Sequence, residues 1–326
     1  MKLRGSASDR CNDRQSEYRC MRRILSIRWP RGLGYPHGRH QREGTIVAPI
    51  SMDLSMSEPI DLDAYLRRIG HVGAVVPQLS TLHALAIAHV AAIPFENLNP
   101  LLGLPVDLEL AALQRKLVQD GRGGYCFEQN LLFAGVLRAI GFEVSGLIAR
   151  VLWNQPEDAV TAQTHMLLRV ELAGESWLVD VGFGGQVLTG ALRLQADIEQ
   201  ATAHEPFRLI MRDGDWRMQS LVRGQWLSLY RFDLKPSQPV DYVVANHYVS
   251  THPASRFVGN LIMARTAADR RLSLLNREFT VRRLGHEPER HTLRDSAEIR
   301  RVMEHEFLLR VPDYADLDRR LDNLPS

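Results

Sequence analysis

Residues 165–183 read HMLLRVELAGESWLVDVGF, and this stretch decides how the chain around it folds. Apolar residues dominate both halves, and the dipeptide Ala173-Gly174 separates them, so we expect a β-hairpin with a two-residue turn. The expected register forms three cross-strand pairs: Val170 with Trp177, Leu168 with Val179, and Met166 with Val181.

The two faces of this hairpin differ in chemistry. The three pairs place only apolar side chains on one face. His165 and Asp180 fall on the opposite face, with Asp180 diagonal to His165. A shift of the register by two residues would change their separation but not the face that they share. We therefore expect a histidine and a carboxylate to lie close together, although a lone strand histidine is more often structural.

The predicted secondary structure changes from helices to short strands along the chain. Before the hairpin, the spacing of apolar residues predicts helices over 60–69, 79–93, 109–120 and 127–140. Short strands separated by Gly, Asp and Pro are expected at 144–152, 165–172, 177–183, 208–211, 216–221 and 226–232. This set favours a closed or nearly closed antiparallel sheet. Two strands, 265–274 and 278–284, and a helix, 296–307, make the last third mixed.

The amino-acid composition is typical of a globular protein and not of a disordered or membrane-spanning one. The 326 residues are 45% hydrophobic and 24% charged, as in globular proteins, and the sequence has no apolar run long enough to span a membrane. Three cysteines without a close pair favour a reducing compartment. Residues 1–50 carry 11 Lys and Arg against 4 Asp and Glu and show no periodicity, which predicts a basic, disordered extension over 1–52.

Cys126 is the candidate nucleophile. The turn Arg122-Gly123-Gly124-Tyr125 precedes it, and a predicted helix begins there. Unpaired N–H groups and the helix dipole at such a position stabilise a thiolate, although a buried structural cysteine fits the same pattern. A thiolate needs a histidine partner, and His165, with Asp180 beside it, is the best candidate.

Two other kinds of site fit less well. Gly182, Gly184 and Gly185 are compatible with a phosphate-binding loop, but equally with a bend at a barrel corner. Neither the histidines nor the cysteines show the spacing of metal ligands, so no metal is expected.

Five segments occur in a characteristic order: PFENL at 94–98, RGGYCFEQN at 122–130, THM at 164–166, VDVGFGG at 179–185, and residues 246–257. Together they resemble the arylamine N-acetyltransferases. The resemblance extends from about Leu62 to the C-terminus and excludes the basic extension. It implies a catalytic triad of Cys126, His165 and Asp180.

The resemblance also implies an α+β fold with a cysteine-protease-like Cys-His-Asp arrangement. A helical bundle over 53–141 would carry Cys126, a central antiparallel β-barrel over 142–245 would carry His165 and Asp180, and an α/β lid would span 246–326. The implied reaction is a ping-pong transfer of acetyl from acetyl-CoA, through a cysteine thioester, to an arylamine, arylhydrazine or hydrazide.

The implied partners are acetyl-CoA and a small aromatic amine or hydrazine, with no nucleic acid and no membrane. A cytoplasmic monomer or homodimer is expected. Candidate substrate contacts are Arg122, Tyr125, Phe127, Phe183, Gly184 and Gly185. Phe257 is a further candidate for an aromatic pocket, and Arg122 and Glu128 are expected to form an ion pair or to orient the start of the helix.

Two alternatives remain at this stage. A Cys-His-Asp order also serves a transglutaminase-like enzyme or an amide hydrolase. A binding protein that retains an inactive triad is the second alternative.

Overall fold

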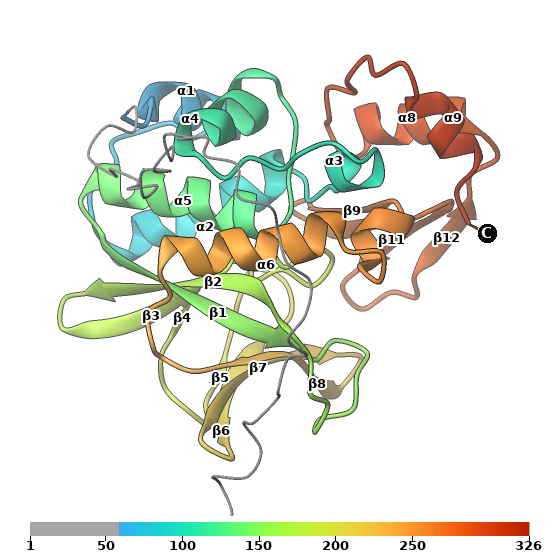
Figure 1. Ribbon diagram of the computed structural model, residues 1–326. Helices are drawn as coiled ribbons and strands as arrows, with labels where there is room; N and C mark the ends of the chain where they lie inside the picture. The colour runs from blue at the N-terminus through green and yellow to red at the C-terminus, as the bar shows by residue number, and fades with distance from the viewer. Residues whose placement is uncertain (1–58, 326) are drawn as a thin grey trace, which may run out of the picture. The chain divides into compact units, whose positions relative to one another are not determined.

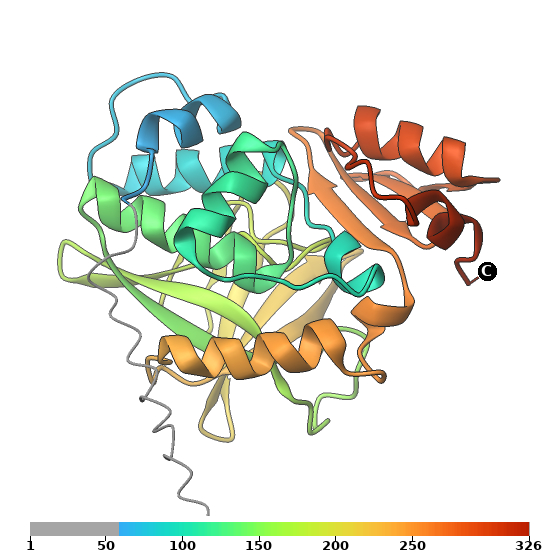
Figure 2. The ribbon, with the colours of Figure 1, turned by 45° about the horizontal axis from the view of Figure 1, so that its top comes forward.

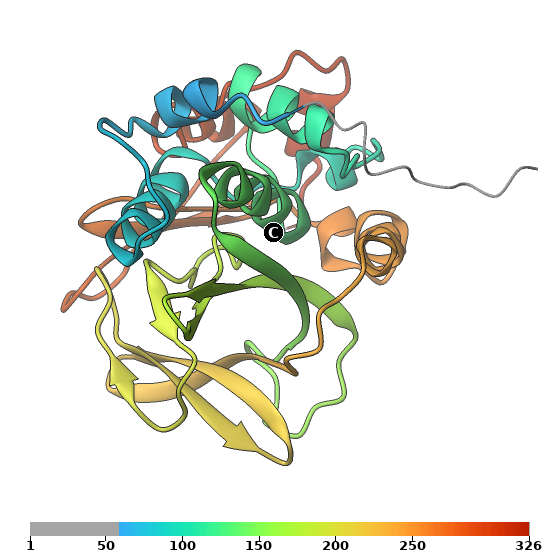
Figure 3. The same ribbon diagram turned by 90° about the vertical axis from the view of Figure 1, so that its left-hand side faces the viewer.

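The computed structural model describes residues 59–325, so the predicted extension lies outside the described residues. Helices come first, and Figures 1 and 3 show α1, α2, α4 and α5 on one side of a large sheet. The bounds are α1 Leu62–Ile69, α2 Leu79–Ala92, α3 Leu98–Leu101, α4 Leu110–Leu113 and α5 Cys126–Ile140, with a π-helical segment, Gln114–Gln119, that continues α4.

Local signals fix the ends of these helices. The carboxylate of Asp61 accepts the N–H of Ala64 at 2.9 Å and caps α1. Gly141, with φ of 106°, ends α5 in the left-handed conformation that glycine adopts readily. The helices predicted at 60–69, 79–93 and 127–140 are confirmed. The prediction for 109–120 is only partly right, because four α-helical residues there give way to the π-helical segment.

An eight-stranded antiparallel sheet forms the centre of the structure, with strand order β4-β3-β2-β1-β8-β7-β6-β5. The strands are β1 Glu143–Val151, β2 Gln163–Leu172, β3 Glu175–Val179, β4 Ala191–Arg193, β5 Glu199–Gln200, β6 Phe207–Arg212, β7 Asp215–Val222 and β8 Gln225–Phe232. After β4 the chain meets β6, where the N–H of Asp197 donates to the carbonyl of Leu209 at 2.8 Å. The sheet is therefore nearly closed, as predicted, around buried apolar side chains such as Leu147, Leu178 and Phe207.

The hairpin of β2 and β3 has the predicted register over most of its length. Leu168 pairs with Val179 and Val170 with Trp177, and the turn residues Ala173 and Gly174 have φ of 53° and 78°. The predicted strand 177–183 is wrong in its second half, and the pair of Met166 with Val181 does not form. Strand β3 ends at Val179 because the carboxylate of Asp180 accepts the N–H of Gly182 at 2.9 Å and turns the chain away from β2.

The C-terminal part begins with α6, Pro239–Thr251, which packs against the outside of the barrel (Figure 2), and α7, Arg256–Gly259. A four-stranded antiparallel sheet of order β12-β11-β10-β9 follows and packs on two helices through a second apolar core. The bounds are β9 Ile262–Thr266, β10 Arg270–Leu275, β11 Glu278–Arg283, β12 Glu289–Thr292, α8 Ser296–His305 and α9 Leu317–Asp322.

Two predictions fail in this part. The single strand expected at 265–274 is two strands, β9 and β10, with a turn at residues 267–269 between them. Helix α6 was not predicted. The border between barrel and lid, set after residue 245, falls inside that helix, and the three-region division stays a prediction.

One short segment before α3 joins the turn that precedes Cys126 to the C-terminal sheet. The N–H of Phe95 donates to the carbonyl of Ala264 in β9 at 2.8 Å, and the N–H of Glu96 donates to the carbonyl of Gly124 at 3.1 Å. The buried carboxylate of Glu96 also binds the guanidinium of Arg122 at 2.6 Å. The turn before Cys126 is therefore attached both to α3 and to the C-terminal sheet.

Candidate active site

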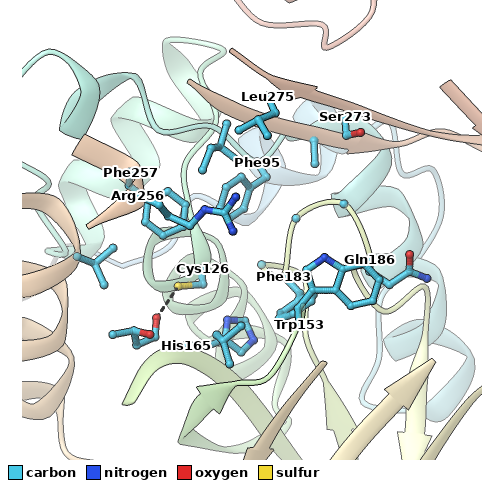
Figure 4. A pocket seen from close by; sticks show the side chains of 18 of the residues that line it. Phe95, Cys126, Trp153, His165, Phe183, Gln186, Arg256, Phe257, Ser273 and Leu275 are labelled. Carbon is cyan, nitrogen blue, oxygen red and sulfur yellow. Dashed lines mark hydrogen bonds between the residues drawn. The ribbon is translucent and has the colours of Figure 1, made fainter. Parts of the chain in front are cut away.

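Cys126 is the first residue of α5, as predicted, and its side chain is 5% exposed. The Glu128 carboxylate accepts the N–H of Tyr125 at 3.0 Å and so fixes the start of the helix. The thiol lies 3.5 Å from the carbonyl oxygen of Thr164, the residue before His165 in β2. Helix α5 and the barrel therefore bring the sulfur and the imidazole to the same place, as Figure 4 shows.

His165 and Asp180 form a buried hydrogen-bonded pair. The distance from His165 Nε2 to Asp180 Oδ2 is 2.7 Å, and the two residues are 2% and 1% exposed. The other ring nitrogen, Nδ1, does not take part in this hydrogen bond. The shared face expected from the hairpin parity is thus present.

The pair sets the charge of the imidazole. Burial disfavours the charged form, but the Asp180 carboxylate and the hydrogen-bonded Cys126 side chain outweigh burial and raise the pKa of His165 to about 10. Burial also opposes the charge of Asp180, whereas His165 and the N–H of Gly182 hold the pKa of Asp180 below its usual range. His165 therefore carries a positive charge at neutral pH.

These two shifts have opposite consequences for stability. The contribution of His165 is fully present below pH 6.5, its ordinary pKa, and is lost as the pH rises to about 10. The contribution of Asp180 is present above its ordinary pKa of 3.8 and is lost as the pH falls through its lowered value. The pair therefore stabilises the fold most between pH 3.8 and pH 6.5, the ordinary pKa values of the two groups.

Sequence reasoning missed two side chains that hold Asp180. Asn130 donates from Nδ2 to Asp180 Oδ1 at 3.1 Å and to the carbonyl of Met166 at 2.8 Å. Burial and the adjacent Asp180 carboxylate raise the pKa of Tyr230 well above its usual value, so its hydroxyl keeps its proton. Asn130 lies four residues after Cys126 on α5, and that helical spacing is the signal that could have identified it.

Aromatic rings enclose the imidazole on two sides. The ring centroid of His165 lies 5.1 Å from that of Phe183 and 4.8 Å from that of Tyr230. These rings exclude water from the pair and limit the rotation of the imidazole.

Cys126 and His165 both border a cavity of about 630 Å³. Its walls come from the helical part, the barrel and the C-terminal sheet. Aromatic side chains contribute much of its surface: Phe95, Trp153, Phe183 and Phe257 (Figure 4). A cavity of this size and character can hold a small aromatic molecule next to the thiol.

This chain is similar in sequence and in structure to proteins that are already known. A family model described as N-acetyltransferase matches residues 78–315. The arylamine N-acetyltransferase of Mycolicibacterium smegmatis is 49% identical over 230 residues, which are 69% of this chain and 84% of the relative. The chain belongs to the arylamine N-acetyltransferase family.

Two further relatives match a larger part of this chain. The arylamine N-acetyltransferase of Escherichia coli K12 is 43% identical over 253 residues, which are 77% of this chain and 90% of the relative. The structure of the Mycobacterium marinum arylamine N-acetyltransferase in complex with CoA has a TM-score of 0.78 and 42% identity, and the match covers 82% of this chain and all of that one. The family, the α+β fold and the classification as an acetyltransferase are therefore confirmed.

The ion pair expected between Arg122 and Glu128 does not form in this N-acetyltransferase. Arg122 binds Glu96, whereas Glu128 binds Lys116 at 2.7 Å and the N–H of Tyr125. Arg122 and Glu128 are both buried, so neither belongs to a surface ion pair. The carboxylate of Glu96 instead holds Arg122, the first residue of the turn that leads to Cys126, and the carboxylate of Glu128 holds Tyr125, its last residue.

The predicted substrate contacts divide into two groups. Those that line the cavity are Phe183, Gly184, Gly185 and Phe257. Arg122, Tyr125 and Phe127 do not line it. The Tyr125 hydroxyl donates to Asn246, and the fully buried ring of Phe127 packs against that of Tyr242 at a centroid distance of 6.0 Å. Their side chains face the interior of the protein, and we do not retain them as substrate contacts.

None of the helices within residues 59–325 combines the length and the apolar character that a membrane crossing requires. No group of three His, Cys, Asp or Glu side chains in that part of the chain could hold a metal ion.

Gly182 is required where the barrel meets α5. A Cβ atom at this position would lie 2.7 Å from the Cα of Cys126 and 2.7 Å from Nδ2 of Asn130, closer than such atoms approach. We expect Gly182→Ala to displace the Asp180 loop, to lower the free energy of unfolding by about 1–3 kcal/mol, and to slow acetyl transfer. Denaturant unfolding and a steady-state assay measure both effects.

Gly259→Ala is the matched control, because no heavy atom lies within 4 Å of a Cβ at that position. We expect its stability to stay within about 0.5 kcal/mol of the wild type. Equal stability and activity in the two variants would show that the close approach at Gly182 is unimportant.

Proposed function

We propose that this protein transfers an acetyl group from acetyl-CoA to the nitrogen of an arylamine, arylhydrazine or hydrazide through a thioester on Cys126. One observation carries the mechanism: Cys126 at the start of α5 lies beside His165, whose imidazole is held by Asp180 at 2.7 Å. The family membership supports the overall reaction. The roles of the three residues rest on their geometry.

In the first half-reaction, the Cys126 thiolate attacks the carbonyl carbon of acetyl-CoA while His165 carries the proton that the thiol has lost. The carbon–sulfur bond to CoA then breaks, and the imidazolium returns a proton to the departing CoA sulfur. One thioester replaces another, so the step costs little free energy. A cysteine suits this exchange better than a serine would.

The tetrahedral intermediate of this step needs hydrogen-bond donors for its oxyanion. The N–H of Tyr125 is not available for this role because it donates to Glu128. The N–H groups in the first turn of a helix have no partner within the helix. We therefore assign the oxyanion to the first turn of α5, beginning with the N–H of Cys126 itself.

In the second half-reaction, the amine attacks the acetyl carbon on Cys126. Arylamines are weak bases and are neutral at pH 7, so they reach the cavity as nucleophiles. The imidazole takes the proton that the attacking nitrogen releases, and the Cys126 thiolate is the leaving group. Asp180 stabilises the imidazolium that forms and keeps its ring in position.

The nucleotide end of CoA requires positive charge and backbone donors. Gly184, Gly185, Ser273 and Arg282 are among the residues that line the cavity. The guanidinium of Arg282 already donates to the carbonyl of Gly185 at 2.9 Å. These residues are our candidates for binding the CoA phosphates, and the M. marinum relative with bound CoA supports a cavity of this type.

The direct test of the proposal is to trap the acetylated enzyme. We expect mass spectrometry to detect an acetyl group on Cys126 after incubation with acetyl-CoA, and addition of an arylamine to remove it. We expect Cys126→Ala to lose both acetylation and turnover while its thermal midpoint stays within a few degrees, since removing one sulfur costs about 1 kcal/mol. Turnover by Cys126→Ala would disprove the nucleophile assignment, and rapid release of acetate without an amine would indicate a hydrolase.

Asp180→Asn tests the third residue. The substitution keeps the size of the side chain but removes the charge that holds the proton on His165. We expect alkylation of Cys126 by iodoacetamide at pH 7 to slow at least about tenfold, with a smaller change near pH 9.5, where a thiol ionises without assistance. Acetylation by acetyl-CoA should slow in parallel.

Asp158→Asn is the matched control, because Asp158 is exposed in the loop between β1 and β2. A circular dichroism spectrum identifies a variant that fails to fold. A folded Asp180→Asn protein with the alkylation profile and acetylation rate of the control would remove Asp180 from the mechanism.

A further inference from the structure

A network of three buried polar side chains crosses the helical part of the protein. It joins Tyr65 of α1, His89 of α2 and Gln129 of α5, which are 1%, 0% and 0% exposed. The Tyr65 hydroxyl lies 2.9 Å from His89 Nδ1, and His89 Nε2 lies 2.6 Å from Gln129 Oε1. Apolar side chains would fill this space at lower cost, because buried polar groups lose their hydration. The network therefore indicates a role beyond packing.

Gln129 connects this network to the turn before Cys126. Its Nε2 donates to the carbonyl of Pro94 at 2.8 Å and to the carbonyl of Gly124 at 3.1 Å. The N–H of Gly124 also donates to the Pro94 carbonyl, at 3.3 Å. One side-chain amide thus holds two backbone segments together, two residues before the candidate nucleophile.

The protons of the network can be placed one by one. Carbonyl groups only accept, so the Gln129 nitrogen faces the two backbone carbonyls and its oxygen faces His89. His89 Nε2 therefore carries a proton, and Nδ1 accepts the hydroxyl of Tyr65. Burial, with a further contribution from Arg68, lowers the pKa of His89 to about 4 in spite of the hydrogen bond to Gln129. His89 is thus a neutral donor at neutral pH.

The turn that Gln129 holds needs such a restraint. Two consecutive glycines, Gly123 and Gly124, allow many backbone conformations. The carbonyl of Gly124 accepts both the Gln129 amide and the N–H of Glu96, the latter at 3.1 Å, so the peptide plane cannot rotate without losing two bonds. This plane leads directly into Tyr125 and the start of α5.

His89 in turn keeps the Gln129 amide in place. His89 Nε2 is the donor that satisfies Gln129 Oε1. Without it, a buried amide oxygen would have no partner, and the amide would have to rotate or shift to find one. Either movement breaks the bonds to the turn. His89 therefore acts on the turn through Gln129, and neither residue is among those that line the cavity.

We propose that His89 is a positioning residue for acetyl transfer, which fixes the turn before α5 through Gln129 and so aligns Cys126 with the acetyl carbonyl. This inference rests on the function proposed above. The charge of the thiol is a separate matter, because it depends on His165 and Asp180. Loss of His89 should therefore impair acyl transfer, which needs an aligned carbonyl and oxyanion donors, more than it impairs ionisation of the thiol.

Three variants separate this role from a purely structural one. His89→Phe keeps an aromatic ring but removes both hydrogen bonds, whereas His89→Gln retains an N–H that can donate to Gln129. Leu82→Ala is the matched control, because Leu82 is fully buried on the same helix and its truncation lowers stability without removing a hydrogen bond. All rates are measured below the thermal transition of each variant.

The readouts are two reactions of the same sulfur. Acetylation of Cys126 by acetyl-CoA is followed in a single turnover, and alkylation by iodoacetamide is followed across pH. We expect His89→Phe to slow acetylation about tenfold, while the rate and pH midpoint of alkylation stay close to those of the wild type. His89→Gln should recover most of the acetylation rate, and Leu82→Ala should leave both reactions nearly unchanged.

Acetylation of His89→Phe at the wild-type rate would overturn the proposal, as would an equal loss in Leu82→Ala, which would make stability the cause. A parallel loss of alkylation would also contradict it, since His89 would then act on thiol ionisation. If His89→Phe does not fold, Gln129→Met removes the same contact from the other side and carries the same expectations. If Cys126 of the wild type were not acetylated at all, the function proposed above would fail instead.

Discussion

The site depends on one buried ion pair, the hydrogen bond of 2.7 Å between His165 and Asp180. An isolated charge in the wall of a barrel would be neutralised, because removing it from water costs several kcal/mol. Here each charge is the partner of the other, and Asn130 and the N–H of Gly182 satisfy the remaining oxygen of the carboxylate. The imidazole can therefore stay charged beside the Cys126 side chain.

The rest of the fold places Cys126 next to that pair. Cys126 lies at the start of a helix, whereas His165 and Asp180 belong to the barrel, so the two parts must approach closely. Gly182 permits backbone contact with Cys126, and hydrogen bonds made by Phe95, Glu96 and Asn97 connect the turn before Cys126 to the C-terminal sheet. The same segment forms part of the cavity wall, which links positioning of the thiol to the shape of the substrate site.

Much of this site could be predicted from local sequence. The turn Ala173-Gly174 sets the register of the hairpin, and its parity puts His165 and Asp180 on one face. Contacts between distant segments could not be predicted in this way. The partner of Arg122 is Glu96, which is 26 residues away along the chain, and helix α6 was missed because its buried residues pack against α5 and the barrel from outside. Strand β3 ends before its predicted last residue because the carboxylate of Asp180 accepts the N–H of Gly182, and this bond turns the chain away from β2.

The charge state of His165 is the most direct test of the claim that Asp180 holds the imidazole in its charged form. The ¹⁵N shifts of its imidazole can be assigned by comparison with a His165→Gln variant and followed across a pH titration. We predict that both ring nitrogens remain protonated at about pH 8 and that the titration midpoint lies at about 10. A neutral ring at that pH, with a midpoint close to the ordinary value of 6.5, would contradict the claim that Asp180 holds the imidazole in its charged form.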